Sequence, residues 1–370
     1  MKTTWILGAG ASISNSNCSY PSIDTIFSKA KKYGIISETT KRIKKEYEDL
    51  HKYIKNNFGK NILRQDEKID IEELLTFLEI SKSKFETSES IVLYEKTINL
   101  IQTLFNNINL KVNSNTEYDI LAKQLNPSDT VITFNWDLML DNTFGRHEIF
   151  KDRHKKSINK QYSNFIEDFS SIDAFSWVSS GIPEPYLKYE SKEGYYLKLH
   201  GSVDWGYCDN KKCRGYGNVI PLKFYQQQYY CGKCHTAFKT LIIPPVLNKQ
   251  YEQYPLISSI WTAAERELNN TNELILWGYS LPPTDFYANW LLHQTNKLNK
   301  VVVINPDVKR GSEKITYNSN FLKRLLKPVG YKSNKIELYE FFSDYISNIN
   351  IAKKYKIDNN FILYSNKRGK

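Results

Sequence analysis

The 370-residue sequence predicts an α/β protein with a parallel sheet covered by helices on both faces, a helical insertion and a small metal-binding module. Three observations lead to this prediction. Short apolar runs typical of buried strands occur at residues 3–7, 130–134, 195–199, 241–243, 273–277 and 300–304. Segments of helical periodicity separate most of these runs, which favours a parallel sheet. Four of the five cysteines lie between Cys208 and Cys234.

Composition indicates a globular protein. A chain with 41% hydrophobic and 14% aromatic residues can bury a substantial core. No apolar run approaches the length that crosses a bilayer, and the start at Met1-Lys2 leads into a strand without a cleavage pattern. We therefore expect a soluble, cytoplasmic protein.

The formal net charge of +11 raises the alternative of a nucleic-acid partner. Most lysines are mixed with acidic residues, as at 41–46, which favours a solvated helix face. Denser basic runs at 151–156 and 367–370 are candidate phosphate contacts. A nucleic-acid-binding sensor without enzymatic activity therefore stays open as an interpretation.

The first apolar run ends in Gly8-Ala9-Gly10-Ala11-Ser12. Glycines at such a turn let the backbone approach a diphosphate, and N–H groups at a helix start can bind its charge. Ile13 occupies the place where the usual dinucleotide fingerprint has its third glycine. Nucleotide binding and a plain tight turn are both compatible with this segment.

Residues 35–125 show helical spacing without a convincing strand, and we predict that they form a helical insertion. Residues 69–79 are its clearest amphipathic segment. The paired Glu72 and Glu73 in that segment fit a solvated face better than a catalytic pair.

Small polar residues follow two later strands. One strand ends in Thr133-Phe134, and Asn135-Trp136-Asp137 follows it at once. His200 follows the strand at 195–199 and precedes Gly201. Because open α/β sheets place ligands at the carboxyl ends of their strands, these side chains are candidates for a pocket. Asn135 or Asp137 could also simply cap the next helix.

The cysteines have the spacing Cys208-x4-Cys213-x17-Cys231-x2-Cys234. Two thiolate pairs separated by a loop of this length predict a structural zinc site in a module at residues 203–240. Four cysteines leave no open position for catalysis at the metal. Substitution of one ligand by His235 and redox chemistry at the second pair are the lesser alternatives.

Strands at 273–277 and 300–304, with helices at 256–268 and 285–293, complete the predicted sheet. Polar or small residues again follow the strand ends, at Gly278, Ser280 and Asn305.

The order of these motifs, from the first strand to about Asp307, resembles the sirtuin family. The resemblance implies one sirtuin-like domain over residues 1–370, built on a Rossmann-type NAD-binding fold with Zn²⁺ in its cysteine module. It implies a catalytic role for Asn135, Asp137 and His200. The positions that would bind NAD⁺ are Gly8, Ala9, Gly10, Ser12, Thr133, Gly278, Ser280 and Asn305. The zinc ligands would be Cys208, Cys213, Cys231 and Cys234.

Two departures from the family pattern lie next to the expected nicotinamide site. Deacetylating members have Pro-Asp-Phe-Arg where this chain has residues 20–24, and a Gln where it has Phe134. The insertion and the sequence Ile-Glu-Glu-Leu-Leu at residues 71–75 resemble those of the bacterial sirtuin-like branch. Members of that branch act as NAD-consuming effectors in antiphage defence, and they are often oligomeric and paired with a HerA-type ATPase, an Argonaute-like protein or another sensor.

We therefore expect an NAD⁺ glycohydrolase, also called an NAD⁺ nucleosidase, that releases nicotinamide and ADP-ribose. Asn135 would position water or a ribose hydroxyl. Asp137 would hold the carboxamide or stabilise the developing positive charge, and His200 would accept a proton. Expected partners are NAD⁺, further copies of the chain and a HerA-type ATPase. An NAD-dependent protein deacylase is the main enzymatic alternative.

Overall fold

The computed structural model describes every predicted nucleotide-site residue and all four clustered cysteines. The described residues are 1–17, 19–37, 42–64, 67–85, 88–109, 115–126, 128–147, 194–216, 219–222, 229–243, 254–282, 285–308, 324–329, 332–333 and 335–348. The basic runs at 151–156 and 367–370 lie outside the described residues.

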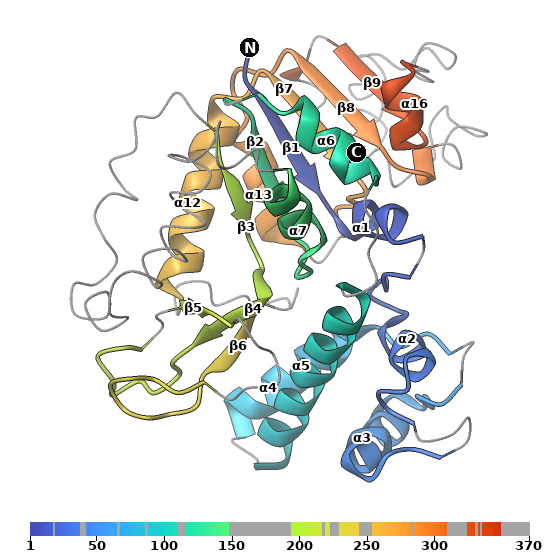
Figure 1. Cartoon of the computed structure of the whole chain (residues 1–370), viewed down its shortest axis with the longest axis vertical. Coiled ribbons are helices and arrows are strands. Elements are labelled where there is room, and N and C mark those ends of the chain that lie inside the picture. The colour runs from blue at the N-terminus through green and yellow to red at the C-terminus, as the bar shows by residue number, and fades with distance from the viewer. Residues whose placement is uncertain are drawn as a thin grey trace, which may run out of the picture.

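A six-stranded parallel sheet forms the centre of the molecule (Figure 1). Its strand order is β3-β2-β1-β7-β8-β9. The strands are β1 (Thr3–Leu7), β2 (Thr130–Thr133), β3 (Tyr196–Lys198), β7 (Glu273–Trp277), β8 (Lys300–Ile304) and β9 (Lys335–Tyr339). This is the doubly wound Rossmann order, in which the direction of strand addition reverses between β1 and β7. Ligands of such folds bind at that switch point.

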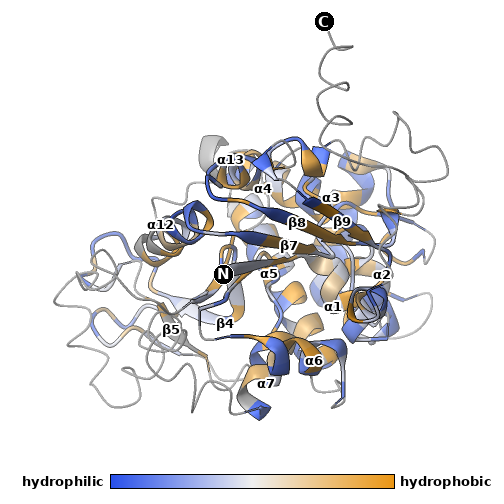
Figure 2. Cartoon of the chain, turned by 90° about the horizontal axis from the view of Figure 1, so that it is seen from above, coloured by the Kyte–Doolittle hydropathy of each residue, from blue (hydrophilic) through white to orange (hydrophobic). Residues whose placement is uncertain are grey.

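Helices cover both faces of the sheet, as predicted (Figure 2). Alternate residues of each strand enter two cores: Trp5 and Leu7 face one side, and Ile6 faces the other. One face packs against α1 (Ala9–Asn15), α6 (Glu117–Gln124), α7 (Met139–Arg146) and α16 (Phe342–Ile346). The other packs against α12 (Pro255–Asn269) and α13 (Phe286–His293). Continuous apolar strands are therefore buried on both sides.

The segment predicted as an insertion is helical wherever it is described, apart from loops and short bridges. It contains η1 (Lys45–Tyr47), α3 (Glu48–Phe58), α4 (Ile71–Phe85) and α5 (Ser88–Asn109), preceded by α2 (Ile26–Lys32). Helix α6 also belongs to the predicted range, but it packs against α1 and α7 beside the main sheet. Thr116 and Asp119 form a capping box that starts it. Among the helices in the described ranges, none combines the length and apolar character that a bilayer crossing requires.

A second, antiparallel sheet has the order β5-β4-β6. Its strands are β4 (Gly201–Tyr207), β5 (Val219–Pro221) and β6 (Lys239–Ile242). The prediction that the run at 241–243 continues the parallel series is wrong, since β6 pairs antiparallel with β4. Gly201 lies at the start of β4 with φ +75°, and a Cβ there would lie 2.2 Å from the Leu241 carbonyl oxygen. Glycine is therefore required where the chain leaves the main sheet.

Candidate functional site

The predicted nucleotide-site residues come from five strands of the main sheet. Each group follows the carboxyl end of its strand: Gly8 to Ser12 after β1, Asn135 and Asp137 after β2, His200 after β3, Gly278 and Ser280 after β7, and Asn305 after β8. Because all these strands are parallel, the groups share one edge of the sheet. The turns after β1 and β7 meet at the switch point.

These two turns pack backbone against backbone. The Gly8 N–H donates to Trp277 O at 3.0 Å, and the Gly10 N–H donates to Gly278 O at 2.9 Å. A Cβ at Gly10 would lie 2.8 Å from the Gly278 Cα. A Cβ at Gly278, which has φ +62°, would lie 2.1 Å from the Ala11 nitrogen. The glycines therefore have a packing role in this turn, whatever it binds.

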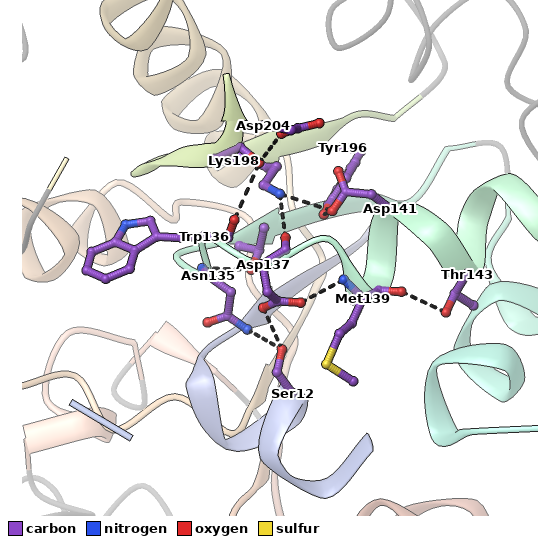
Figure 3. A network of polar contacts seen from close by, with 12 residues as sticks. Ser12, Asn135, Trp136, Asp137, Met139, Asp141, Thr143, Tyr196, Lys198 and Asp204 are labelled. Carbon is purple, nitrogen blue, oxygen red and sulfur yellow. Dashed lines mark hydrogen bonds and ion pairs between the residues drawn. The ribbon is translucent and has the colours of Figure 1, made fainter. Parts of the chain in front are cut away.

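Asn135 is fixed to the glycine turn by its side-chain amide. The Nδ2 group donates to Gly8 O at 3.0 Å and to Ser12 Oγ at 2.9 Å. Its backbone N–H donates to Thr133 Oγ1 at 3.1 Å, and Thr133 Oγ1 donates to Leu7 O. Both N–H bonds of the amide are thus used within the protein. The amide oxygen points away from Ser12 (Figure 3).

Asp137 lies beside Asn135 (Figure 3), with 3% of its surface exposed. Its carboxylate accepts hydrogen bonds from Ser12 Oγ at 2.9 Å and from the Met139 N–H, the first residue of α7, at 2.8 Å (Figure 3). The Tyr20 hydroxyl also bonds to it. Burial raises the pKa of Asp137, while the charge of Lys198 and the hydrogen bonds from the Met139 N–H and Ser12 oppose the rise. Asp137 therefore supports the loop at 135–137 from inside the protein.

Ser12 connects the two side chains. Its hydroxyl donates to Asp137 and accepts from Asn135, and it lies 2.9 Å from the Tyr118 hydroxyl. Since the Ser12 proton is directed to Asp137, the Tyr118 hydroxyl donates to Ser12. Tyr118 belongs to α6, inside the segment that the sequence assigned to the insertion.

Further residues around this loop were missed by sequence analysis. Lys198 donates from Nζ to Asp137 O at 2.6 Å and to Asp141 Oδ2 at 3.0 Å. The Tyr196 hydroxyl donates to the same Asp141 oxygen at 3.1 Å. A lysine inside an otherwise apolar strand was the available signal, because buried lysines are rare unless they are paired.

His200 is 4% exposed and lies among aromatic rings. Its ring centroid is 5.0 Å from that of Phe134 and 6.4 Å from that of Trp261. Phe134 also stacks on Tyr279, with centroids 4.6 Å apart and 10° between the planes. Phe134 directly precedes Asn135, so its ring joins His200 and the β7 turn to the loop at 135–137.

Ser280 and Asn305, which the resemblance to sirtuins would place at the adenosine half of NAD⁺, differ in burial. Asn305 donates its backbone N–H to Tyr339 O, and its Nδ2 lies 3.5 Å from Tyr279 O. Its side-chain oxygen accepts from the Asp307 N–H at 3.0 Å. Ser280 is exposed. Asn305 thus braces the turns after β7 and β8, whereas Ser280 faces solvent.

The four clustered cysteines converge at one point. Cys208 and Cys234 have Sγ atoms 3.7 Å apart, as do Cys213 and Cys231, and all four sulfurs lie within 4.8 Å of one another. Zinc–thiolate bonds of about 2.3 Å in a tetrahedron require sulfurs about 3.8 Å apart. This sulfur arrangement fits a closed four-thiolate zinc site. His235 is not part of the cluster.

Helix α5 connects the cysteine module with the loop at 135–137. Gln102 of α5 donates to Val203 O of β4 at 2.8 Å and accepts from the Thr240 hydroxyl of β6 at 3.0 Å. The Val203 N–H in turn donates to Trp136 O at 3.0 Å. Hydrogen bonds therefore link helix α5, the antiparallel sheet and the loop at 135–137 in series.

No model of a known family and no curated protein matches this sequence. Among solved structures, a complex of a Sir2 homologue with NAD is similar, with 12% identity, 99% of this chain and 90% of that chain covered, and a TM-score of 0.42. A mutant Sir2 homologue with 2′-O-acetyl ADP ribose has 13% identity, coverage of 99% and 92%, and a TM-score of 0.42. Both TM-scores lie below 0.5, so the chemistry of the site is inferred from its own residues.

Proposed function

We propose that the protein is an NAD⁺ glycohydrolase that cleaves the bond between nicotinamide and ribose. One observation carries the proposal: Asn135 is held at the switch point by Gly8 O and Ser12 Oγ, in the same corner as Phe134 and His200. Doubly wound sheets bind nucleotides at this place. The sequence resemblance to sirtuins identifies NAD⁺ as the nucleotide to test.

The proposed reaction breaks the bond in NAD⁺ between the nicotinamide nitrogen and C1′ of the adjoining ribose. Nicotinamide takes the bonding electron pair and leaves as a neutral molecule, so the leaving group needs no proton. Water then adds to the oxocarbenium-like C1′ and loses a proton, giving ADP-ribose. Because the Asn135 Nδ2 protons bond to Gly8 and Ser12, its side-chain oxygen is the group that orients water or a ribose hydroxyl. His200 accepts the released proton.

We assign Asp137 an indirect role. It is 3% exposed and bonded to Ser12 and the Met139 N–H, so it orients Asn135 through Ser12. This replaces the sequence-based expectation that Asp137 holds the carboxamide or stabilises the developing charge.

We propose that Zn²⁺ binds the four cysteines and has a structural role. Four thiolates fill a tetrahedral coordination sphere, which leaves no position for substrate or water. The metal would fix the antiparallel sheet whose Val203 bonds to Trp136, next to Asn135.

The test is NAD⁺ consumption by the purified chain, with products separated by chromatography. We expect nicotinamide and ADP-ribose in equal amounts from the wild type. Asn135→Ala and His200→Ala should each lower turnover by at least about 100-fold. The control is Asn142→Ala, which removes an exposed amide from α7. Wild-type protein that leaves NAD⁺ intact, alone and with the product of the neighbouring gene, contradicts the proposal.

The same assay with an acetylated peptide separates hydrolysis from deacylation. A deacylase produces acetyl-ADP-ribose and consumes NAD⁺ only when the peptide is present. A glycohydrolase produces ADP-ribose at the same rate with or without the peptide.

From the sequence resemblance we also propose a role in antiphage defence, as a cytoplasmic homo-oligomer that acts with a HerA-type ATPase or another sensor. Cellular NAD⁺ should then fall after phage infection in cells carrying the wild-type gene. It should stay constant in cells carrying the Asn135→Ala gene.

A further inference from the structure

Lys198 places a charged amine in the interior beside the candidate site. Its side chain is fully buried. The amine donates to Asp137 O at 2.6 Å and to Asp141 Oδ2 at 3.0 Å (Figure 3). An unpaired ammonium in such a place costs several kcal/mol. The ion pair with Asp141 therefore makes the burial of Lys198 possible.

The contacts of Lys198 complete a clamp on the loop at 135–137. On one side, Gly8 O and Ser12 Oγ hold the Asn135 amide. On the other side, the Val203 N–H of β4 holds Trp136 O, and Lys198 of β3 holds Asp137 O. The loop is thus fixed at three consecutive residues, by the glycine turn and α1 on one side and by β4 and β3 on the other.

Asp141 and Tyr196 orient the amine. The Tyr196 hydroxyl and Lys198 Nζ donate to the same Asp141 oxygen, at 3.1 and 3.0 Å. Tyr196 and Lys198 are two positions apart on β3, so their side chains leave the same face of the sheet. Asp141 lies on the first turn of α7, which follows the loop.

We propose that Lys198 is a positioning residue for the reaction, which holds the Asp137 carbonyl and so fixes the direction of the Asn135 side chain. The inference rests on the proposed function and deepens it. Lys198 acts through Asp137 and Asn135 and makes no contact with the substrate itself. A misplacement of about 1 Å at such a site can cost about 100-fold in rate.

If the ion pair between Lys198 and Asp141 has only a structural role, activity should recover whenever stability recovers. Variants that remove one charge or both charges of the pair distinguish this role from the positioning role. Lys198→Met leaves the Asp141 carboxylate in the interior without its cation, so the melting temperature should fall. Lys198→Met combined with Asp141→Asn removes both charges of this pair and keeps an acceptor for Tyr196. Asp137 and Asp204, whose ionised forms the charge of Lys198 also favours, remain and can take up a proton instead. Neutralising a buried pair restores stability in such cases. In both variants the backbone carbonyl oxygen of Asp137 loses the hydrogen bond that Lys198 Nζ donates in the wild type.

We expect the melting temperature of the double variant to return to within a few degrees of the wild type. Its kcat for NAD⁺ should stay at least about 10-fold low, with KM changed less than about 2-fold. We expect kcat to fall while KM stays nearly constant, because the glycine turn and the turns after β7 and β8, where NAD⁺ would bind, are unchanged. The control is Lys300→Met, which breaks ion pairs to Glu273 and Glu337. It should lower stability without lowering kcat.

Recovery of kcat together with the melting temperature would overturn the positioning role. Hydrogen exchange at residues 134–139 gives a readout that does not depend on NAD⁺. Exchange there should accelerate in the double variant relative to the wild type and the Lys300→Met control. Unchanged hydrogen exchange in the double variant overturns the inference, even if the wild type has no activity. Accelerated exchange in the double variant together with an inactive wild type contradicts only the proposed function.

Discussion

Ser12 joins the side chains of two predicted site residues, Asn135 and Asp137. It donates one proton to Asp137 and accepts from Asn135 and Tyr118. Its neighbour Ser14 is exposed and bonds to Ala11 O and Glu117 instead. The two serines lie two positions apart on α1, yet only one faces the sheet edge.

We predict that Ser12→Ala lowers NAD⁺ turnover by about 10- to 100-fold, because Asn135 loses the acceptor that fixes its amide. Stability should fall by about 1–3 kcal/mol, since buried partners lose hydrogen bonds. Steady-state kinetics and urea denaturation measure the two effects. Ser14→Ala is the matched control, and an equal loss of turnover in that variant would contradict the prediction.

Asp204 gives a pH-dependent prediction. Burial raises the pKa of its carboxyl to about 6, although the charge of Lys198 opposes the rise. In the unfolded chain the pKa is about 3.9. Below about pH 4 the group is mostly protonated in both states. Between about pH 4 and pH 6 the unfolded chain ionises while the folded state resists ionisation, so the wild type loses stability over this range, and above it the loss is complete.

Asp204→Asn should therefore match the wild type at pH 4 and be more stable by about 1–3 kcal/mol at pH 7.5. Urea denaturation at pH 4, 6 and 7.5 tests the difference. A variant that is less stable than the wild type at pH 7.5 would show that the ionised carboxylate is favourable in the fold.

At the scale of elements, the close contact between the turns after β1 and β7 requires glycine at position 278 for two reasons, its left-handed backbone conformation and the lack of space for a Cβ. Gly278 has φ +62° and would place a Cβ 2.1 Å from the Ala11 nitrogen. Gly59, which ends α3, has φ +65° and nothing within 4 Å of such a Cβ. The two positions share a backbone conformation and differ in their surroundings.

Gly278→Ala should destabilise the protein by more than about 3 kcal/mol, since backbone strain and overlap add. Gly59→Ala should cost only about 1 kcal/mol, from the left-handed conformation alone. Thermal unfolding of the two variants measures the contribution of the close approach between the turns. Equal costs would mean that this contact contributes nothing.

The cysteine module gives a second prediction for an element. Cys213→Ser should reduce bound zinc from one equivalent to a small fraction, because three thiolates hold the ion less tightly. Hydrogen exchange should accelerate over residues 201–242, with little change in β1, β2, β7 and β8. Cys18→Ser, which changes the fifth cysteine, should keep the zinc. Retention of zinc by Cys213→Ser would contradict the four-thiolate assignment.

At the scale of the whole molecule, the insertion, the module and the sheet edge are joined through Gln102. Its amide group bonds at once to Val203 O and to the Thr240 hydroxyl. Lys239 of β6 adds an ion pair to Glu95 of α5 at 2.7 Å. Helix α5 therefore contacts β4, the strand whose Val203 N–H donates to Trp136 O.

We predict that Gln102→Ala lowers stability by about 1–2 kcal/mol through the loss of both hydrogen bonds. Turnover of NAD⁺ should fall roughly 3- to 10-fold, because Val203 becomes less fixed against the loop at 135–137. Thr103→Ala is the control, since Thr103 is exposed and bonds only within its own helix. Unchanged turnover in Gln102→Ala would show that α5 does not influence the loop.

Local pattern was sufficient to predict five of the six strands in the main sheet, because a strand buried on both faces must be continuously apolar. Strand β9 was missed, since Lys335 and Glu337 interrupt its apolar residues. The direction of β6 was misassigned, since a short apolar run carries no information about its pairing partner.

The sequence alone determined the sheet class, the position of polar groups at the strand ends and the cysteine set, because these depend on residue type and spacing along the chain. Only the tertiary structure decided that Asn135 bonds to Ser12 across 123 positions and that Tyr118 and Lys198 join them. Hydrogen bonds are directional and short, so their pairing depends on how distant elements pack, and no local periodicity records that packing.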